Sequence, residues 1–136
     1  MDVLITGSTG MVGKSVLYQC IRDNRVKNIV LINRLPVDLK NEKITELIIE
    51  DFLNIGELKS EINNCDACYH CMGITSFGQN SDYYYKVTFE MTKVLTDLVY
   101  EINPNAVMTY VSGEGTSTKE NSNIPWANVK GKTENY

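Results

Sequence analysis

A glycine-rich turn near the amino end, set between an apolar segment and a helical pattern, constrains this chain most. The segment DVLITG, residues 2–7, has the apolar and β-branched composition of a strand. After the turn TGSTGMVG, apolar residues recur at helical spacing over residues 10–23. Free amides at the start of such a helix face an anion, and glycines let the backbone approach it closely. The sequence therefore predicts a strand, a phosphate-binding turn and a helix.

Strand and helix patterns alternate through the rest of the chain. Further strands are predicted at 28–34, 46–51, 65–73 and 106–112, and helices at 55–64, 83–102 and from about Pro125. This alternation is typical of a parallel sheet whose two faces are covered by helices. We therefore expect a single α/β domain over residues 1–136, with a Rossmann-like doubly wound sheet of about five strands in the order 3-2-1-4-5.

Composition and charge exclude several classes of protein. With 43% hydrophobic and 22% charged residues, the chain has the balance of a soluble globular domain. A net charge of -4 and the lack of a lysine and arginine cluster argue against binding to nucleic acid or to an anionic membrane. No apolar run approaches the about 20 residues of a membrane span, and the first residues lack a signal-peptide pattern. We expect a cytoplasmic protein whose four cysteines are reduced thiols.

Each glycine of the turn has a predicted task. Gly7 permits the tight bend, Gly10 lets the backbone approach a pyrophosphate, and Gly13 lets the helix pack closely on the sheet. The residues of the turn predicted to bind a cofactor are Gly7, Ser8, Thr9, Gly10, Met11, Val12 and Gly13. The alternative is a glycine-rich turn that only begins a helix.

The G-x-x-G-x-x-G spacing of this turn resembles that of the short-chain dehydrogenase/reductase superfamily, in the extended or atypical branches that include NAD-dependent epimerase/dehydratase-like proteins. Further matches follow in the superfamily's order: Asp51-Phe52 after the third strand, Met72-Gly73 after the fourth, Ser112 after the fifth and Lys130 on the next helix. The resemblance covers nearly the whole chain. It implies that Asp51 contacts adenine and that Gly73 lines the cofactor, and it places their neighbours Phe52 and Met72 among the cofactor-binding residues. A strand-end carboxylate and a turn glycine are the alternatives.

The end of the second predicted strand bears on the choice of cofactor. A NAD-selective site places Asp or Glu there to bind the ribose 2′-hydroxyl, whereas this chain has Asn33 and Arg34. A guanidinium can bind a 2′-phosphate with paired hydrogen bonds, whereas a carboxylate would repel it. We therefore favour NADP(H), with NAD(H) as the second choice. A solvated strand-end charge is the alternative role for Arg34.

The proton donor departs from the resembled superfamily. In that superfamily a tyrosine four residues before the lysine exchanges a proton with the substrate, the lysine binds the nicotinamide ribose, and a Ser or Thr after the fifth strand holds the substrate oxygen. Here Trp126 precedes Lys130 by four residues, and an indole N–H donates a hydrogen bond but cannot act as the acid or base. Ser112, Trp126 and Lys130 are the candidate catalytic residues, with Gly113 and Thr116 as alternatives to Ser112.

Other tyrosines are weaker candidates for a proton donor. Tyr110 shares a strand face with Ser112 because side chains alternate along a strand. Tyr136 lies about 15 Å beyond Trp126 along a continuous helix, which is too far. The run of tyrosines at 83–85 is more typical of packing or of an interface than of catalysis.

Cys65, Cys68 and Cys71 form a C-x-x-C-x-x-C run beside His70, the only histidine. On a strand, a spacing of three places successive side chains on opposite faces, so the thiols could not converge on one ion. We therefore predict core cysteines and no metal site. No partner for His70 is visible in the sequence, so the residue has no defined role.

The last predicted helix ends soon after it begins, whereas the resembled superfamily continues with further strands and a substrate-binding region. We therefore expect that the C-terminal part of the usual fold is missing and that the sequence does not identify the substrate. The resemblance also implies a homodimer through the 83–102 helix, which often packs against its copy in that superfamily. Three functions fit: an NADP(H)-binding domain with little or no oxidoreductase activity; an active NADPH-dependent reductase or nucleotide-sugar epimerase/dehydratase that uses Ser112, Lys130 and another acid; and a sensor or scaffold controlled by nucleotide occupancy.

Overall fold

The computed structural model describes all 136 residues and contains one five-stranded parallel sheet. The strands are β1 (Asp2–Thr6), β2 (Asn28–Asn33), β3 (Ile44–Ile48), β4 (Ala67–His70) and β5 (Val107–Tyr110). The helical segments are α1 (Met11–Arg22), the 3-10 segment η1 (Phe52–Glu61), α2 (Ser81–Tyr85), the π-helical turn η2 (Lys86–Glu90), α3 (Met91–Ile102) and α4 (Pro125–Asn135). The strand order is β3-β2-β1-β4-β5, so the predicted architecture and order are confirmed.

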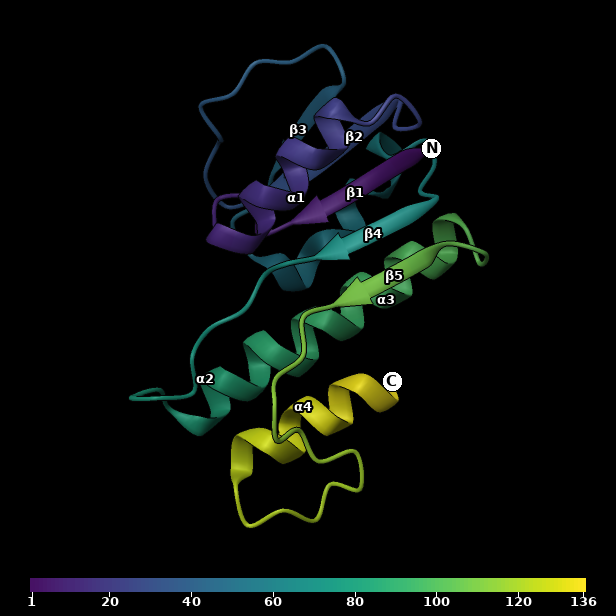
Figure 1. Ribbon diagram of the computed structural model, residues 1–136. Helices are drawn as coiled ribbons and strands as arrows, with labels where there is room; N and C mark the ends of the chain where they lie inside the picture. Colours follow the sequence, from purple (N-terminus) through teal and green to yellow (C-terminus); the bar gives the residue numbers. More distant parts are fainter.

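Helical segments cover both faces of the sheet, with α1 on one face and α3 on the other (Figure 1). The α1 face holds a cluster of eight buried residues, in which Leu17 packs against Ile5 and Ile29. On the opposite face, η1 and α3 enclose 13 buried residues that include Leu4 and Leu95. Burial of each leucine side chain stabilises the folded state by roughly 1.5–3 kcal/mol, so these two clusters hold the helices on the sheet.

In the register of the sheet, the carboxyl ends of β1, β2, β4 and β5 lie side by side. Thr6 at the end of β1 lies opposite Ile32 of β2 and His70 of β4, and His70 lies opposite Tyr110 of β5. The chain segments that follow these strands therefore leave the sheet at one edge. In open α/β sheets this carboxyl edge is where ligands bind.

Three predicted strands have clearly different bounds, of which the fifth, predicted at 106–112, spans only Val107–Tyr110. The third, predicted at 46–51, is displaced toward the amino end, and its last ladder bond runs from the N–H of Ile49 to the carbonyl of Asn33. The fourth, predicted at 65–73, is shorter because its partner β1 ends at Thr6, whose carbonyl accepts from the N–H of Cys71 at 3.1 Å. The helix predicted at 55–64 is the 3-10 segment η1, which starts at Phe52.

The short β4 also corrects the expectation for the cysteines. Cys65 precedes the strand, and its side chain joins Cys68 in the same buried cluster rather than on the opposite face. Both thiols are fully buried, and no group of three His, Cys, Asp or Glu side chains that could hold a metal ion forms around them. Burial raises the pKa of Cys65 to about 11 and that of Cys68 well above the ordinary value.

The helix predicted at 83–102 starts at Ser81, where the side chain of Asn80 caps it, and ends at Ile102. A π-helical turn, η2, interrupts the helix, and such turns often occur at functional sites. Here the carbonyl of Thr88 accepts from the hydroxyls of Thr92 at 2.7 Å and Thr133 at 3.4 Å. The second of these bonds ties the turn to α4, which lies beside it. No helix in the structure combines the length and the apolar character that a membrane crossing requires.

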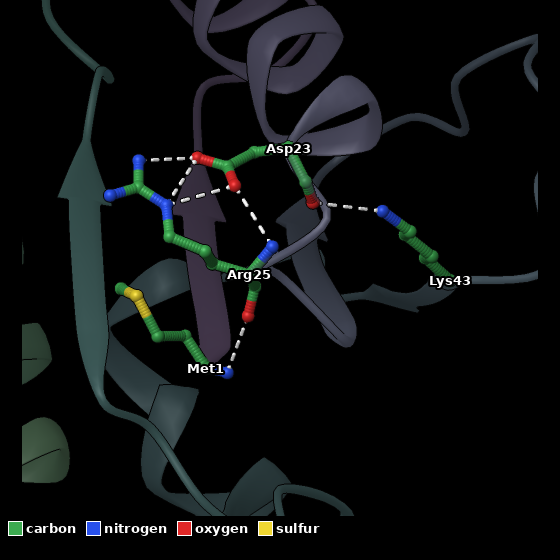
Figure 2. A network of polar contacts seen from close by, with 4 residues as sticks. All are labelled: Met1, Asp23, Arg25 and Lys43. Carbon is green, nitrogen blue, oxygen red and sulfur yellow. Dashed lines mark hydrogen bonds and ion pairs between the residues drawn. The ribbon is translucent and has the colours of Figure 1, made fainter.

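The opposite edge of the sheet is closed by a polar network at the end of α1 (Figure 2). The Lys43 ammonium donates to the carbonyls of Ile21 and Asp23 at 2.8 and 3.0 Å, which satisfies acceptors that a helix end leaves open. The Asp23 carboxylate accepts from Arg25, whose carbonyl accepts from the Met1 ammonium at 2.7 Å. These bonds fix the turn between α1 and β2. None of these residues lies at the carboxyl edge of the sheet.

Candidate functional site

A groove follows the carboxyl edge of the sheet, and we call it the strand-end groove. It consists of three adjoining cavities of about 700, 270 and 210 Å³. Met72, just beyond β4, lines all three, and Arg34, Glu50 and Phe52 line both the first and the second. Gly73 and Ile74 line the second and the third. The groove thus extends without a break from the ends of β2 and β3 to the end of β5.

The glycine-rich turn forms the wall of the first cavity. Gly7 has a φ of +71°, and a Cβ atom there would meet the backbone N of Met72 at 2.6 Å. A Cβ atom on Gly13 would meet the carbonyl oxygen of Gly7 at 2.1 Å, so α1 packs directly on the turn. Any other residue at Gly7 would force the turn away from the segment after β4, and any other residue at Gly13 would force α1 away from the turn.

The start of α1 has the properties of an anion site. Gly10 is its N-cap, and no side chain caps the helix. The first amides of a helix have no partner within it, so those after Gly10 are free to donate. A Cβ atom on Gly10 would meet nothing closer than the carbonyl oxygen of Gly7 at 3.4 Å, so the space around it is open. A diphosphate would fit this cradle, and Thr9, Met11 and Val12 are exposed around it.

Ser8 and Asn33 lock the turn to β2, and Asn33 also lines the first cavity. The hydroxyl of Ser8 donates to the Asn33 side-chain oxygen at 3.0 Å. The Asn33 amide nitrogen donates to the Ser8 oxygen at 2.8 Å and to Glu46 at 3.0 Å. Ser8 is completely buried and Asn33 is 6% exposed. Their geometry positions the turn, and their predicted contacts with a cofactor stay predictions.

The next part of the groove contains charges of both signs. Arg34 is exposed and forms no ion pair or side-chain hydrogen bond. Asp51 caps η1 by accepting from the N–H of Leu53 at 3.1 Å, and it lines the second cavity. Phe52, 3% exposed, forms the wall between the first two cavities. The structure therefore brings the predicted Arg34, Asp51 and Phe52 to one place.

Several lining residues were not predicted from the sequence. Glu50 lines the first two cavities, because β3 ends at Ile48 and does not extend over the predicted residues 46–51. The first cavity is also lined by Ile32, Leu35 and Ile48, the second by Ile74, Tyr83, Lys86, Val87 and Met91, and the third by Cys71, Thr88 and Val111. Leu35 follows Arg34 directly, and the strand-end position was the only signal that could have indicated it.

Lys130 lies at the far end of the groove, in the third cavity. Its ammonium donates to the carbonyl of Val111 at 3.1 Å and to the hydroxyl of Tyr110 at 3.3 Å. Burial lowers the pKa of Lys130, and Glu134 opposes this shift. Ser112 lines the same cavity, and its hydroxyl donates to the Glu134 carboxylate. The predicted Ser112 and Lys130 are thus brought together.

Trp126 shares a face of α4 with Lys130, as the spacing of four predicts. Its ring packs over the turn after β5, where a Cβ atom on Gly115 would lie 3.5 Å from the indole. Trp126 is half-buried and does not line the third cavity. Thr116 donates to the carbonyl of Gly113 at 2.7 Å, and its hydroxyl oxygen lies 3.1 Å from that of Ser112. Of the three alternatives for the serine position, only Ser112 reaches the cavity.

His70 lies beneath the groove, and both ring nitrogens have partners. Nδ1 is 2.6 Å from the hydroxyl of Thr6, and Nε2 is 2.9 Å from that of Thr92. Because Thr92 donates to a carbonyl, its oxygen accepts from Nε2–H, and Nδ1 accepts from Thr6. Burial, with a smaller effect of Lys130, lowers the pKa of His70 to about 4. The imidazole is therefore a neutral structural group that links β1, β4 and α3.

Comparison with known proteins fits this geometry. The sequence profile of the NAD dependent epimerase/dehydratase family matches residues 3–131. Protein FMP52, mitochondrial, of Kluyveromyces lactis is 27% identical over 139 aligned positions, which cover 98% of this chain and 59% of that protein.

Among solved structures, UDP-glucose 4-epimerase of Thermotoga maritima superposes with a TM-score of 0.75 at 18% identity, covering all of this chain and 50% of that one. A short-chain dehydrogenase/reductase superfamily protein of Agrobacterium tumefaciens with bound NAD superposes with a TM-score of 0.72 at 20% identity, covering 99% and 43%. This chain thus spans about half the length of these structures. With the profile matching nearly from end to end and the fold in agreement, the chain belongs to the NAD dependent epimerase/dehydratase family.

Proposed function

We propose that this chain binds a nicotinamide adenine dinucleotide in the strand-end groove. The observation that carries the proposal is the cradle at Gly7 and Gly10, where a glycine in the left-handed region leads into an uncapped helix start. Family membership and the bound NAD of the superposed Agrobacterium protein support it. When bound, the coenzyme would supply a hydride donor or acceptor, and this chain's residues would hold and orient it.

We favour NADP(H) over NAD(H) because of the charge next to the first cavity. Arg34 follows β2 with a free guanidinium, and the carboxylate that would bind a ribose 2′-hydroxyl is missing there. Glu50 lies in the same cavity and opposes this preference, because a carboxylate repels a 2′-phosphate. Arg34 has the advantage that its guanidinium matches a phosphate with two parallel hydrogen bonds.

We further propose that the chain has little or no oxidoreductase activity by the usual tyrosine relay. Trp126 stands where that relay needs a titrating group, and an indole has none. An active reductase or a nucleotide-sugar epimerase/dehydratase is the second candidate, and Lys130 and Ser112 in one cavity favour it. Substrate, activity and partners of the whole protein belong to these proposals, since the chain spans about half of its structural relatives.

Calorimetric titration of the wild-type chain with NADPH and NADH tests the function. We expect both to bind, with NADPH tighter. Arg34→Ala should weaken NADPH binding about tenfold and leave NADH unchanged, the loss expected for hydrogen bonds to a charged group. Arg22→Ala is the matched control, because Arg22 is an exposed arginine at the far end of α1. Tighter binding of NADH would refute the preference, and no binding of either coenzyme would refute the function.

A further inference from the structure

The ammonium of Lys130 is hydrogen-bonded to the last residue of β5 and to the residue that follows it. It is 3.1 Å from the carbonyl of Val111 and 3.3 Å from the hydroxyl of Tyr110. It also lies 5.0 Å from the centroid of the Tyr110 ring. These contacts fix the end of a flexible side chain, which would otherwise lose rotamer freedom when a ligand orders it. The lysine is therefore preordered at the end of the groove.

Tyr110 is itself fixed and uncharged. Its ring stacks on His70 at a centroid distance of 6.0 Å, and it lines the third cavity together with Lys130 and Ser112. Burial raises the pKa of Tyr110 to about 12, with smaller contributions from Tyr84 and Glu134 in the same direction. The phenol is thus neutral at physiological pH, and its oxygen accepts from the lysine.

Trp126 cannot provide this contact. The indole has no oxygen to accept from an ammonium group, and it packs over Gly115 rather than along the cavity. The side chain of Lys130 runs past Gly113, where a Cβ atom would lie 3.6 Å from its Cδ and Cε atoms. Tyr110, on β5 and outside the W-x-x-x-K pattern, is consequently the only phenol bonded to Lys130.

We propose that Tyr110 is the positioning residue for Lys130 and thereby sets the affinity for the nicotinamide half of the coenzyme. This inference rests on the proposed function, in which Lys130 binds the ribose next to the nicotinamide. The hydroxyl of Tyr110 acts through the lysine, although its side chain lines the same cavity. The glycine-rich turn and Arg34 hold the other half and are independent of this pair.

Coenzyme fragments separate the two halves in a binding experiment. NADPH and 2′-phospho-ADP-ribose both contain the second ribose, whereas adenosine 2′,5′-bisphosphate lacks it. Tyr110→Phe keeps the ring, its stacking on His70 and the ring face toward Lys130, and removes only the hydroxyl. We expect this variant to bind NADPH and 2′-phospho-ADP-ribose about fivefold more weakly, the effect of one hydrogen bond, and adenosine 2′,5′-bisphosphate as the wild type does.

The chain offers a matched control on the same helix. Lys132 donates to the hydroxyl of Tyr85 at 2.7 Å, with its ammonium 5.0 Å from that ring, and neither residue lines the groove. Tyr85→Phe removes an equivalent hydroxyl and should leave the affinity for all three ligands unchanged. Thermal melts of both variants report whether either substitution changes folding.

A double-mutant cycle tests whether Tyr110 acts through the lysine. In a Lys130→Met background, Tyr110→Phe should have no further effect on NADPH affinity. An equal loss for all three ligands, an additive effect in the Lys130→Met background, or no loss for NADPH in Tyr110→Phe would overturn the assignment. If wild-type protein binds adenosine 2′,5′-bisphosphate while one of these results is obtained, the positioning role fails and the proposed function stands.

Discussion

Lowering the pH from 7 to 5 should destabilise this protein through one group, His70. It is the only histidine, so no other side chain with an ordinary pKa titrates in this interval. Its imidazole is 1% exposed, and its two nitrogens are bonded to neutral threonine hydroxyls. A protonated ring would carry two N–H donors, and the hydroxyl of Thr6 would have to reverse its hydrogen bond without any anion nearby to balance the charge.

The size of the effect follows from the two pKa values. Burial holds the pKa of His70 at about 4 in the folded protein, against 6.5 for the exposed side chain. Between these values the unfolded chain binds more protons than the folded one, so the free energy of unfolding falls as the pH falls. The loss between pH 7 and pH 5 is about 2 kcal/mol, and it levels off below about pH 4.

Urea unfolding followed by Trp126 fluorescence at pH 5, 6 and 7 measures this loss, and NMR of the imidazole C–H protons gives the folded pKa directly. His70→Gln is the control, because without the imidazole the dependence between pH 5 and 7 should vanish whatever the stability of the variant. A folded pKa near 6.5, together with a free energy of unfolding that does not change over this interval, would refute the reasoning.

Three further predictions concern packing, chemistry and assembly. A Cβ atom on Gly131 would meet the carbonyl oxygen of Ser117 at 1.8 Å, so Gly131→Ala should lower the free energy of unfolding by about 1–3 kcal/mol in urea melts. Gly56→Ala, where nothing lies within 4 Å, should not lower it, and equal losses would contradict the packing argument. Trp126→Tyr should raise NADPH oxidation with a panel of carbonyl compounds above the wild-type rate; loss of an existing activity would instead give the tryptophan its own role. Sedimentation equilibrium should detect a dimer if the 83–102 helix pairs with its copy, and a monomer at high concentration would exclude it.

The site could be predicted from the sequence where local backbone rules dominate. The roles of Gly7 and Gly13 follow from a turn that no larger residue can adopt, and the structure has the close contacts that this requires. Lys130 and Trp126 could be placed on one helical face because a spacing of four fixes it. The free position of Arg34 followed from its place at the end of a buried strand.

Other features depend on which strands are neighbours. The sequence run containing Cys65 and Cys68 suggested a long strand with the thiols on opposite faces, but the end of β1 limits β4 to four residues. The partners of His70 come from β1 and α3, far away in the sequence, so no local pattern could reveal that the ring is neutral. Glu50 entered the groove only because β3 ends earlier than its apolar pattern indicates.

The sequence by itself determined the alternation of elements and the glycine-rich turn, because these depend on hydrophobic periodicity and on backbone sterics. The order of the sheet could be predicted only as the order that is typical of a doubly wound fold with this alternation. Only the tertiary structure decided that Tyr110 meets Lys130 and that Trp126 does not reach the third cavity. The physical reason is that a hydrogen bond between β5 and α4 depends on how two elements separated by a loop pack together, and residue spacing along the chain does not record that distance.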